Sequence, residues 1–350
     1  MNFAFMSIFS REEKYMARAI DIARRGEGMV SPNPLVGAVI VYNNKIIAEG
    51  WHEKYGEAHA EVNAINQLSD ELLKKSEIFV SLEPCSHYGK TPPCADLIIS
   101  KQIPKVFISI KDPNPLVSGS GIKKLEQAGI DIQSGILKKE GEWLNRRFLI
   151  NILKQRPYVI LKWAQSKDGF VAGENGRTVK ISNEISQVHS HKLRAREDAI
   201  LVGAQTVIND NPRLNTRHYK GKNPLRVTFD FENSLPLDST IFNQEAKTIV
   251  FNYSKEKISE NVTWLRLEPN KELIPQILNH LYKLNIGSLI VEGGTKTLNL
   301  FIESGIYDEI HVFEGDLRIK KGIIAPDINL DSASSKKILK KDCYYFFKIN

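Results

Sequence analysis

Long apolar runs and cysteine are what this sequence lacks most. No stretch of its 350 residues approaches the roughly 18 consecutive apolar residues that a membrane-spanning helix needs, so we expect no membrane partner. The opening MNFAFMSIF is too short for a signal peptide and lacks its basic start. Three cysteines cannot build a disulfide framework, which indicates a reducing compartment. These shortages together predict a cytoplasmic protein.

Clusters of one charge are also missing. The net charge of +7 suits anionic ligands such as phosphates, and it would also suit nucleic acid. The lysines are spread along the chain, and no basic cluster interleaved with aromatic residues indicates a nucleic-acid surface. We therefore expect a small phosphorylated ligand and no nucleic acid.

Short apolar runs alternate with helical segments along the first half, which predicts βαβ units and a sheet covered by helices on both faces. The segment 10–26 predicts a helix with a capping box from Ser10 to Glu13, and 36–50 predicts a hairpin around Asn43 and Asn44. Further strands are expected at 77–82, 105–110 and 130–135, and further helices at 59–68, after Cys94, near 121–128 and at about 138–155.

The second half repeats this style without repeating the sequence, and QRPYV at 155–159 marks the crossing into it. Because 350 residues exceed the usual single domain, we expect two α/β domains, 1–155 and 156–350. Strands are expected at 158–164, 199–203, 225–231, 247–252, 288–294 and 309–314, and helices at 183–196, 271–285 and 295–304.

One histidine and two cysteines have the residue types and number of a catalytic zinc site. Such a site takes three protein ligands and leaves a fourth position for water, and His59, Cys85 and Cys94 supply three. The pKa of the bound water falls from about 16 towards about 7. Glu61 stands two residues after His59 and can move the proton without binding the metal, which is the H-x-E then P-C logic of zinc deaminases.

Three other interpretations of these residues stay open. A structural zinc site would need a fourth ligand, which His52 or His87 could supply. A disulfide between Cys85 and Cys94 is sterically allowed but unsuited to a reducing compartment. Chance is less favoured, because Pro84 precedes Cys85 as the deaminase pattern requires.

The segments PNPLVGAVIV, GEAHAEVNAI and LEPCSHYGKTPPCADLI resemble the N-terminal half of the bifunctional deaminase–reductases of riboflavin biosynthesis. The match covers most of 11–150. The general deaminase signature is P-C-x-x-C, whereas here eight residues separate Cys85 from Cys94, and that insert is typical of the riboflavin family. The resemblance implies a cytidine-deaminase-like three-layer α/β/α domain that binds one Zn²⁺ per chain.

Four neighbouring residues are candidates for substrate binding in this domain. Asn33 offers a donor and an acceptor suited to the edge of a pyrimidinone ring, and prolines on both sides keep its backbone extended; a plain turn is the alternative. His52 could meet the base or its phosphate. His87 and Lys90 lie in the insert and could bind the ribose phosphate, or belong to a solvated loop.

In the second half, SLIVEGGTKTLNLF at 288–301 predicts a strand, two glycines and a helix. Such a turn lets backbone amides approach a phosphate at a helix N-terminus, although it is commonly only a turn. The segments LKWAQSKDG (161–169), 191–217 and VEGGTKTL (291–298) resemble the reductase half of the same family. That resemblance implies a dihydrofolate-reductase-like α/β domain that uses NADPH.

The resemblance also implies which residues serve the reductase. Contacts to the dinucleotide fall on Gln165, Thr206, Asp210, Gly293, Gly294, Thr295, Lys296, Thr297 and Leu298, and Lys180, at a position where the family differs, could still meet a phosphate of NADPH. Contacts to the sugar phosphate fall on Thr178, Arg194, Leu214, Arg217 and Glu292. The arginines make independent sense, because a guanidinium group matches a phosphate in two-point geometry.

The reductase half departs from the family pattern at several points. Lys180 stands where the family usually has Trp, Phe231 where a small hydroxyl residue is frequent, and the Pro-Lys-Leu-[IL]-Gly pattern after 311–322 is missing. We therefore keep a working deaminase with an altered or inactive reductase as one alternative.

The resemblance implies a cytoplasmic two-step enzyme of riboflavin synthesis. Zinc-dependent hydrolysis would deaminate 2,5-diamino-6-ribosylamino-4(3H)-pyrimidinone 5′-phosphate, and NADPH would then reduce the ribosyl side chain to ribityl. A homodimer and a homotetramer are both left open. The rivals are a nucleic-acid-editing zinc deaminase with an accessory domain and a non-enzymatic nucleotide sensor with structural zinc.

Overall fold

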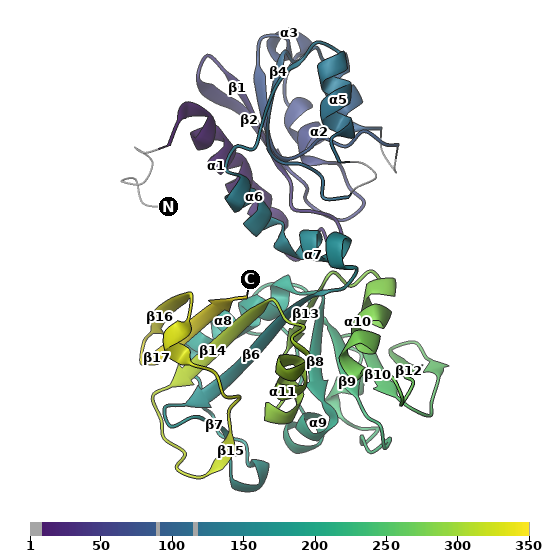
Figure 1. Ribbon diagram of the computed structural model, residues 1–350, viewed down its shortest axis with the longest axis vertical. Coiled ribbons are helices and arrows are strands. Elements are labelled where there is room, and N and C mark those ends of the chain that lie inside the picture. Colours follow the sequence, from purple (N-terminus) through teal and green to yellow (C-terminus); the bar gives the residue numbers. More distant parts are fainter. Residues whose placement is uncertain (1–8, 89–91, 115–117, 350) are drawn as a thin grey trace. The chain divides into compact units, whose positions relative to one another are not determined.

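Two compact units make up the chain, Met1–Lys154 and Gln155–Asn350. Figure 1 shows the computed structural model, which describes residues 9–88, 92–114 and 118–349. Within these ranges, no helix has the length and apolarity needed to cross a membrane.

A five-stranded sheet forms the centre of the first unit, in the order β2-β1-β3-β4-β5. The pairs β2–β1 and β1–β3 are antiparallel, and β3, β4 and β5 run parallel. Asn43 (φ 49°) and Asn44 (φ 59°) close the β1–β2 hairpin in the left-handed region that asparagine tolerates. The strands are β1 (Gly37–Tyr42), β2 (Lys45–Trp51), β3 (Glu77–Leu82), β4 (Lys105–Ile110) and β5 (Asp131–Ser134).

Helices cover both faces of this sheet. Alternate strand residues point to opposite sides, and both sets are apolar here, so each face needs a covering layer. Ala38 and Ile40 pack with α2 (Ala60–Ile65), α4 (Cys94–Ser100) and α5 (Ser120–Gln127). Val39 and Val41 pack with the opposite layer, α1 and α6. The remaining helices are α1 (Arg11–Ala23), η2 (Arg24–Gly26), α3 (Asp70–Leu73), α6 (Lys138–Leu144) and α7 (Arg146–Lys154). The three-layer fold is confirmed, as is the capping box at Ser10.

The single helix expected at 138–155 is wrong, because the structure breaks it at Asn145. The Asn145 side chain is buried and exchanges two hydrogen bonds with the backbone of Leu35, from Leu35 N at 2.8 Å and to Leu35 O at 3.0 Å. This long-range tether separates α6 from α7, and helical periodicity cannot reveal it.

A ten-stranded sheet forms the second unit, in the order β11-β12-β10-β9-β8-β13-β6-β14-β17-β16. The seven strands from β12 to β14 run parallel, and β11, β17 and β16 pair antiparallel. These strands are β6 (Tyr158–Ser166), β8 (Ala199–Gly203), β9 (Leu225–Phe229), β10 (Thr248–Asn252), β11 (Lys257–Ile258), β12 (Val262–Arg266), β13 (Ser288–Val291), β14 (Glu309–Gly315), β16 (Ser335–Leu339) and β17 (Asp342–Lys348).

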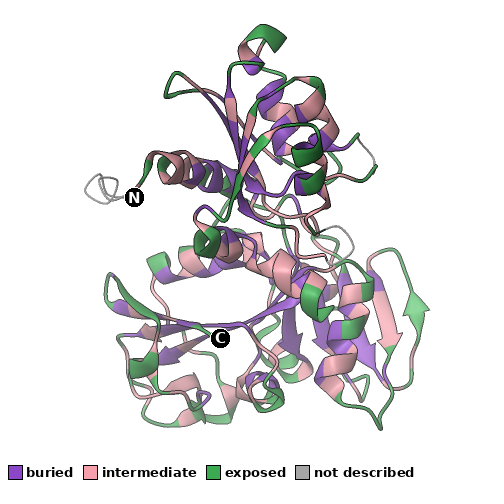
Figure 2. Ribbon diagram, turned by 45° about the horizontal axis from the view of Figure 1, so that its top comes forward, coloured by how far each residue is buried: buried purple, intermediate pink, exposed green. Residues whose placement is uncertain are grey.

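The central strands of this sheet are buried on both faces, as Figure 2 shows in purple. Ile277 and Leu281 of α10 and Phe301 of α11 belong to the main apolar core on one face. β7 (Phe170–Gly173) and β15 (Gly322–Ile324) form a separate two-stranded sheet. The helices are η3 (Glu174–Gly176), α8 (Glu184–Arg196), α9 (Ala204–Asp210), η4 (Thr240–Phe242), α10 (Leu273–Lys283), α11 (Thr295–Ser304) and η5 (Leu330–Ser332).

Sequence patterns found the six neighbouring strands from β10 to β14 at the centre of this sheet and missed the strands outside them, of which β17 is largely buried. All six expected strands are present, with small differences in their ends, and so are the three expected helices. The lysine-rich edge strand β16 was missed, because its residues Ser335–Ile338 are exposed and show no apolar alternation. Lysines on a sheet edge block pairing with other chains. The strands β7, β11, β12, β15 and β17 and the helix α9 were also missed.

Candidate active sites

Three metal-binding side chains converge in the first unit. His59 is the N-cap of α2, Cys94 is the first residue of α4, and Cys85 lies in the loop after β3. His59 Nδ1 lies 3.3 Å from Cys94 Sγ and 3.6 Å from Cys85 Sγ. The three ligand atoms all lie within 4.8 Å of one another.

These distances suit a tetrahedral zinc ion. Bond lengths of about 2.1 Å to nitrogen and about 2.3 Å to sulfur place neighbouring ligand atoms about 3.6 Å apart. The three cysteines are free thiols, so no disulfide competes. Among the described residues, no fourth histidine, cysteine or carboxylate joins this group. The donor set therefore fits zinc with one position left for another ligand.

Glu61 lies beside these ligands in the first turn of α2 and is only 3% exposed. Burial and then the Cys85 thiolate raise the pKa of Glu61 to about 7, while His59 acts in the opposite direction. Hydrogen bonds from Cys94 and His59 lower the pKa of the Cys85 thiol, which favours the thiolate that a metal needs. A carboxyl that titrates near neutral pH can both take and give a proton.

The four candidate substrate residues fall in different surroundings. Asn33 Nδ2 lies 3.1 Å from His52 Nε2, and His52 Nδ1 lies 3.0 Å from the carbonyl oxygen of Ala58. His52 is buried, so the structure places it behind Asn33 with protein partners at both ring nitrogens. His87 is exposed on the insert. Lys90 lies outside the described residues.

A second site is a cavity of about 810 Å³ in the second unit. Its walls come from β6, β7, β8, α9, β15, the segment 175–182 and the β13–α11 turn. Ten of the candidate reductase residues line it: Thr178, Lys180, Thr206, Asp210, Glu292, Gly293, Gly294, Thr295, Lys296 and Thr297. Thr178 Oγ1 donates a hydrogen bond to Asp210, which joins two sides of the cavity wall.

The turn from β13 into α11 requires glycine at Gly293. A Cβ on Gly293 would lie 2.6 Å from Cβ of Thr297, so a larger residue would push α11 away from the turn. The Gly294 N–H donates to Thr206 Oγ1 at 3.2 Å. The N-terminus of α11 therefore opens on the cavity wall, where a helix favours an anion.

Five of the candidate reductase residues do not line this cavity. Gln165 is buried, and its Oε1 accepts a hydrogen bond from Trp163 Nε1 at 2.8 Å. Arg217 is an exposed residue that lines a separate hollow formed by the segment 215–223 and Glu245. The others are Arg194, Leu214 and Leu298.

Glu292 carries two cations at the cavity wall. Arg194 Nε and Nη2 lie 2.7 and 2.8 Å from its two carboxylate oxygens, and Lys162 Nζ lies 3.1 Å from Oε2. Burial alone would raise the pKa of Glu292, but Arg194 and Lys162 outweigh it and hold the pKa at about 2. Burial lowers the pKa of Lys162, although Glu292 partly opposes it.

Comparison with known proteins identifies both halves of the chain. The RibD C-terminal domain family matches residues 157–315, and the zinc-binding region of cytidine and deoxycytidylate deaminases matches residues 9–110. Riboflavin biosynthesis protein RibD of Bacillus amyloliquefaciens is 42% identical over 326 residues, which cover 91% of this chain and 87% of that protein. RibD of Aquifex aeolicus is 39% identical and covers 96% of this chain, with 98% of its own length matched.

The chain belongs to the RibD family. Solved structures agree with the sequence relatives. A diaminohydroxyphosphoribosylaminopyrimidine deaminase/5-amino-6-(5-phosphoribosylamino)uracil reductase from Thermotoga maritima matches with a TM-score of 0.89 at 35% identity, covering 97% of this chain and 99% of that one. RibD of Acinetobacter baumannii matches with a TM-score of 0.84 at 31% identity, covering 97% and 98%. The protein is a bifunctional enzyme of riboflavin biosynthesis, with a cytidine-deaminase-like N-terminal domain followed in the sequence by a reductase domain.

Sequence reasoning missed two residues, Lys162 and Glu83. Lys162 sits inside LKWAQSKDG, yet only the structure shows its nearly buried ammonium group at Glu292 in the cavity. Glu83, two residues before Cys85, accepts hydrogen bonds from four backbone N–H groups between 3.0 and 3.3 Å. A lysine within an apolar strand was the one available signal for Lys162.

Proposed function

We propose that the first unit hydrolyses the ring amino group of 2,5-diamino-6-ribosylamino-4(3H)-pyrimidinone 5′-phosphate. The observation that carries this proposal is the convergence of His59, Cys85 and Cys94 with Glu61 buried beside them. These three ligands would hold one Zn²⁺. A zinc ion in such a site lowers the pKa of water towards neutral and so supplies a nucleophile.

Glu61 moves the proton in this reaction. Water adds its oxygen to the ring carbon, its proton passes to the Glu61 carboxylate, and Glu61 then delivers a proton to the departing amino group, which leaves as ammonia. A pKa near 7 suits both directions of transfer. Asn33 binds the edge of the pyrimidinone ring, and His52 holds the Asn33 amide in place. His87 and Lys90 bind the ribose phosphate.

The second unit reduces the deaminated product, with NADPH in the 810 Å³ cavity. Bound NADPH supplies a hydride. The Gly293–Leu298 turn with Thr206 and Asp210 would hold the dinucleotide, and Lys180 would meet one of its phosphates. An α11 N-terminus that opens on the cavity suits a phosphate and supports this fit. Gln165 would contact the dinucleotide after a small local rearrangement, since it is buried and bonds to Trp163 of the cavity wall.

Lys162 is placed to supply the proton that reduction needs. Hydride addition at C1′ of the ribosyl group breaks the C1′–O4′ bond, and the ring oxygen then takes up one proton. Lys162 lines the cavity, and its burial lowers the pKa of the ammonium group. Glu292 keeps Lys162 in position, and Thr178, Arg194, Leu214 and Arg217 bind the sugar phosphate.

An inactive reductase is less well supported than an active one. The residues that depart from the family pattern leave the cavity and its buried Lys162–Glu292–Arg194 cluster in place. We also propose that nucleic acid is not a substrate.

Two substitutions test both halves of this proposal in one chain. Glu61→Gln should lower ammonia release by about 100-fold or more while leaving zinc content and reduction of the deaminated product unchanged. Lys162→Met should lower reduction of the deaminated product while leaving ammonia release and zinc content unchanged. Loss of both activities in either variant would contradict the claim that deamination and reduction occur at separate sites. Full ammonia release in Glu61→Gln would rule out Glu61 as the proton carrier.

A further inference from the structure

Asn215 holds two arginines that lie outside the dinucleotide cavity wall. Its side-chain Oδ1 accepts a hydrogen bond from Arg217 Nη1 at 3.0 Å, and its backbone oxygen accepts one from Arg194 Nη1 at 3.2 Å. Asn215 is buried, with 7% of its surface exposed, whereas Arg217 is exposed. In the described part of the chain, Asn215 Oδ1 is the one hydrogen-bond acceptor of the Arg217 guanidinium group.

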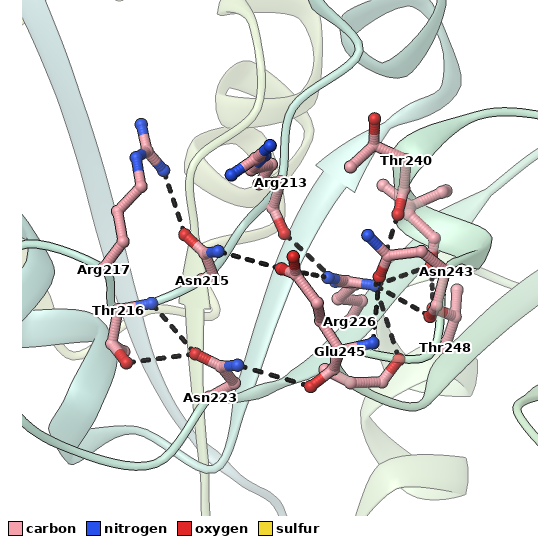
Figure 3. A network of polar contacts seen from close by, with 12 residues as sticks. Arg213, Asn215, Thr216, Arg217, Asn223, Arg226, Thr240, Asn243, Glu245 and Thr248 are labelled. Atoms are coloured by element: carbon pink, nitrogen blue, oxygen red, sulfur yellow. Dashed lines mark hydrogen bonds and ion pairs between the residues drawn. The ribbon is translucent and has the colours of Figure 1, made fainter.

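The Asn215 amide is itself fixed from behind, as Figure 3 shows. Its Nδ2 donates to Glu245 Oε2 at 2.9 Å, and that carboxylate lies 3.6 Å from Nη2 of Arg226. Arg226 is fully buried and donates to Asn243 Oδ1 at 2.8 Å and to the carbonyl oxygen of Arg213 at 3.1 Å. The contacts run in one line from buried Arg226 to exposed Arg217, so Asn215 cannot rotate its amide without losing a partner.

Because Asn215 is neutral, it orients the Arg217 guanidinium group without neutralising its charge. Partial burial lowers the pKa of the Arg217 guanidinium group although the residue is exposed overall, and repulsion from Arg194 and Arg213 lowers it further. Glu292 already neutralises much of the charge of Arg194. A carboxylate at position 215 would do the same to Arg217, whereas an amide orients the guanidinium group and leaves its charge for a ligand.

We propose that Asn215 is a positioning residue that holds Arg217 ready for the phosphate dianion of the reductase substrate. This proposal rests on the proposed function, in which Arg217 binds the sugar phosphate. Asn215 itself does not touch the substrate. Its two oxygen atoms set the spacing of Arg194 and Arg217, and the Glu245–Arg226 pair keeps the amide from turning.

The test is the steady-state kinetics of the reductase half in the full chain, with the deaminated substrate and saturating NADPH. Asn215→Ala should raise the KM for the sugar phosphate about tenfold, the effect of losing one hydrogen bond to a charged group, with kcat and the KM for NADPH within about twofold. Asn223→Ala is the matched control. It removes an amide of the same loop that bonds to Thr216 and to the Glu245 backbone but to neither arginine.

A double-mutant cycle separates this proposal from the function on which it rests. Arg217→Ala should raise the KM more than Asn215→Ala, and adding Asn215→Ala to it should change nothing further, because Asn215 acts through Arg217. An unchanged KM in Asn215→Ala, or an equal rise in Asn223→Ala, would overturn the positioning role alone. An unchanged KM in Arg217→Ala would remove Arg217 from the substrate site and overturn both.

An unchanged kcat and an unchanged KM for NADPH show that the Asn215→Ala chain is folded, whereas Asn215→Asp keeps the shape of the side chain but replaces the donor to Glu245 with a carboxylate oxygen. It retains an acceptor for Arg217 but adds a negative charge against the phosphate. The KM should therefore rise at least as much as in Asn215→Ala, and an unchanged KM would overturn the argument about charge.

Discussion

Asn33 Nδ2 donates a hydrogen bond to Nε2 of the buried His52 across 3.1 Å. The direction follows from the other side of the ring, because Nδ1 faces the Ala58 carbonyl oxygen at 3.0 Å and must carry the proton. Burial lowers the pKa of His52 and keeps the imidazole neutral. The Asn33 amide is therefore fixed, with its oxygen and its second N–H left for a ligand.

Replacing His52 tests this arrangement. His52→Ala should raise the KM of deamination about tenfold, because the amide of Asn33 loses its orientation, and zinc content should stay at one ion per chain. Asn33→Ala should raise the KM further. Steady-state ammonia release and metal analysis measure both effects. A chain that loses its zinc on His52→Ala would place His52 in the metal site instead.

Removing the zinc ion should abolish deamination and leave reduction intact. Treatment with a zinc chelator, or Cys85→Ser, should release one zinc ion per chain and abolish ammonia formation, because the nucleophile is lost. Reduction of the deaminated product should continue unchanged, since none of the metal ligands belongs to the second unit. Cys343→Ser serves as the control thiol. Loss of NADPH oxidation on chelation would contradict this separation.

Glu83 should matter for stability more than an ordinary surface acid. Its carboxylate accepts N–H groups of Asp112, Gly119, Gly121 and Ile122, and it is 5% exposed. Glu83→Gln turns an amide NH2 group, which cannot accept a hydrogen bond, towards these donors and should cost about 3 kcal/mol in the free energy of unfolding.

Glu77→Gln is the matched control for Glu83. This glutamate is more exposed and pairs with Arg11, so its loss should cost less than about 1 kcal/mol. Denaturant unfolding of the first unit in the full chain measures both. Equal costs for the two variants would show that the four backbone contacts of Glu83 add nothing.

Mild acid should destabilise the second unit through His191. Burial, and then Arg194 and Arg217, lower the pKa of His191 to about 3, against about 6.5 in an unfolded chain. Between these values the unfolded state binds more protons, so stability is full above pH 6.5 and falls as the pH drops. The loss from pH 7 to pH 5 is about 2 kcal/mol.

His191→Asn removes this titration. The variant should lose about 2 kcal/mol less than the parent over the same range, as measured by denaturant midpoints at pH 7, 6 and 5. His280→Asn is the comparison, because burial also lowers the pKa of His280 but no arginine adds to that shift, so this variant should recover less stability than His191→Asn. Parallel pH curves for the parent and His191→Asn would contradict a buried neutral His191.

Residues that lie close along the chain could be predicted from the sequence, and those that meet only through the fold could not. His59, Glu61, Cys85 and Cys94 follow a spacing that chemistry itself explains. The partners of Asn215 come from α8, the 215–217 loop and the segment after η4. No local pattern joins them.

The same distinction explains the errors in the fold. Strands buried on both faces, such as β8 and β13, can be predicted because their sequences are continuous apolar runs. Asn145 breaks a helix through a contact with Leu35 more than a hundred residues away, which periodicity cannot show. Lys162 lies within a predicted strand, but its role depends on Glu292, which the fold brings to it from the turn after β13.

One measurement tests the two-step account most directly. The purified chain is given the diaminopyrimidinone ribosylamine phosphate, and ammonia release and NADPH oxidation are followed in the same sample. The account predicts that ammonia appears first, that NADPH is then consumed in a one-to-one ratio, and that ammonia still forms when NADPH is omitted. NADPH oxidation that precedes ammonia release, or the absence of ammonia from a zinc-loaded chain, would contradict it.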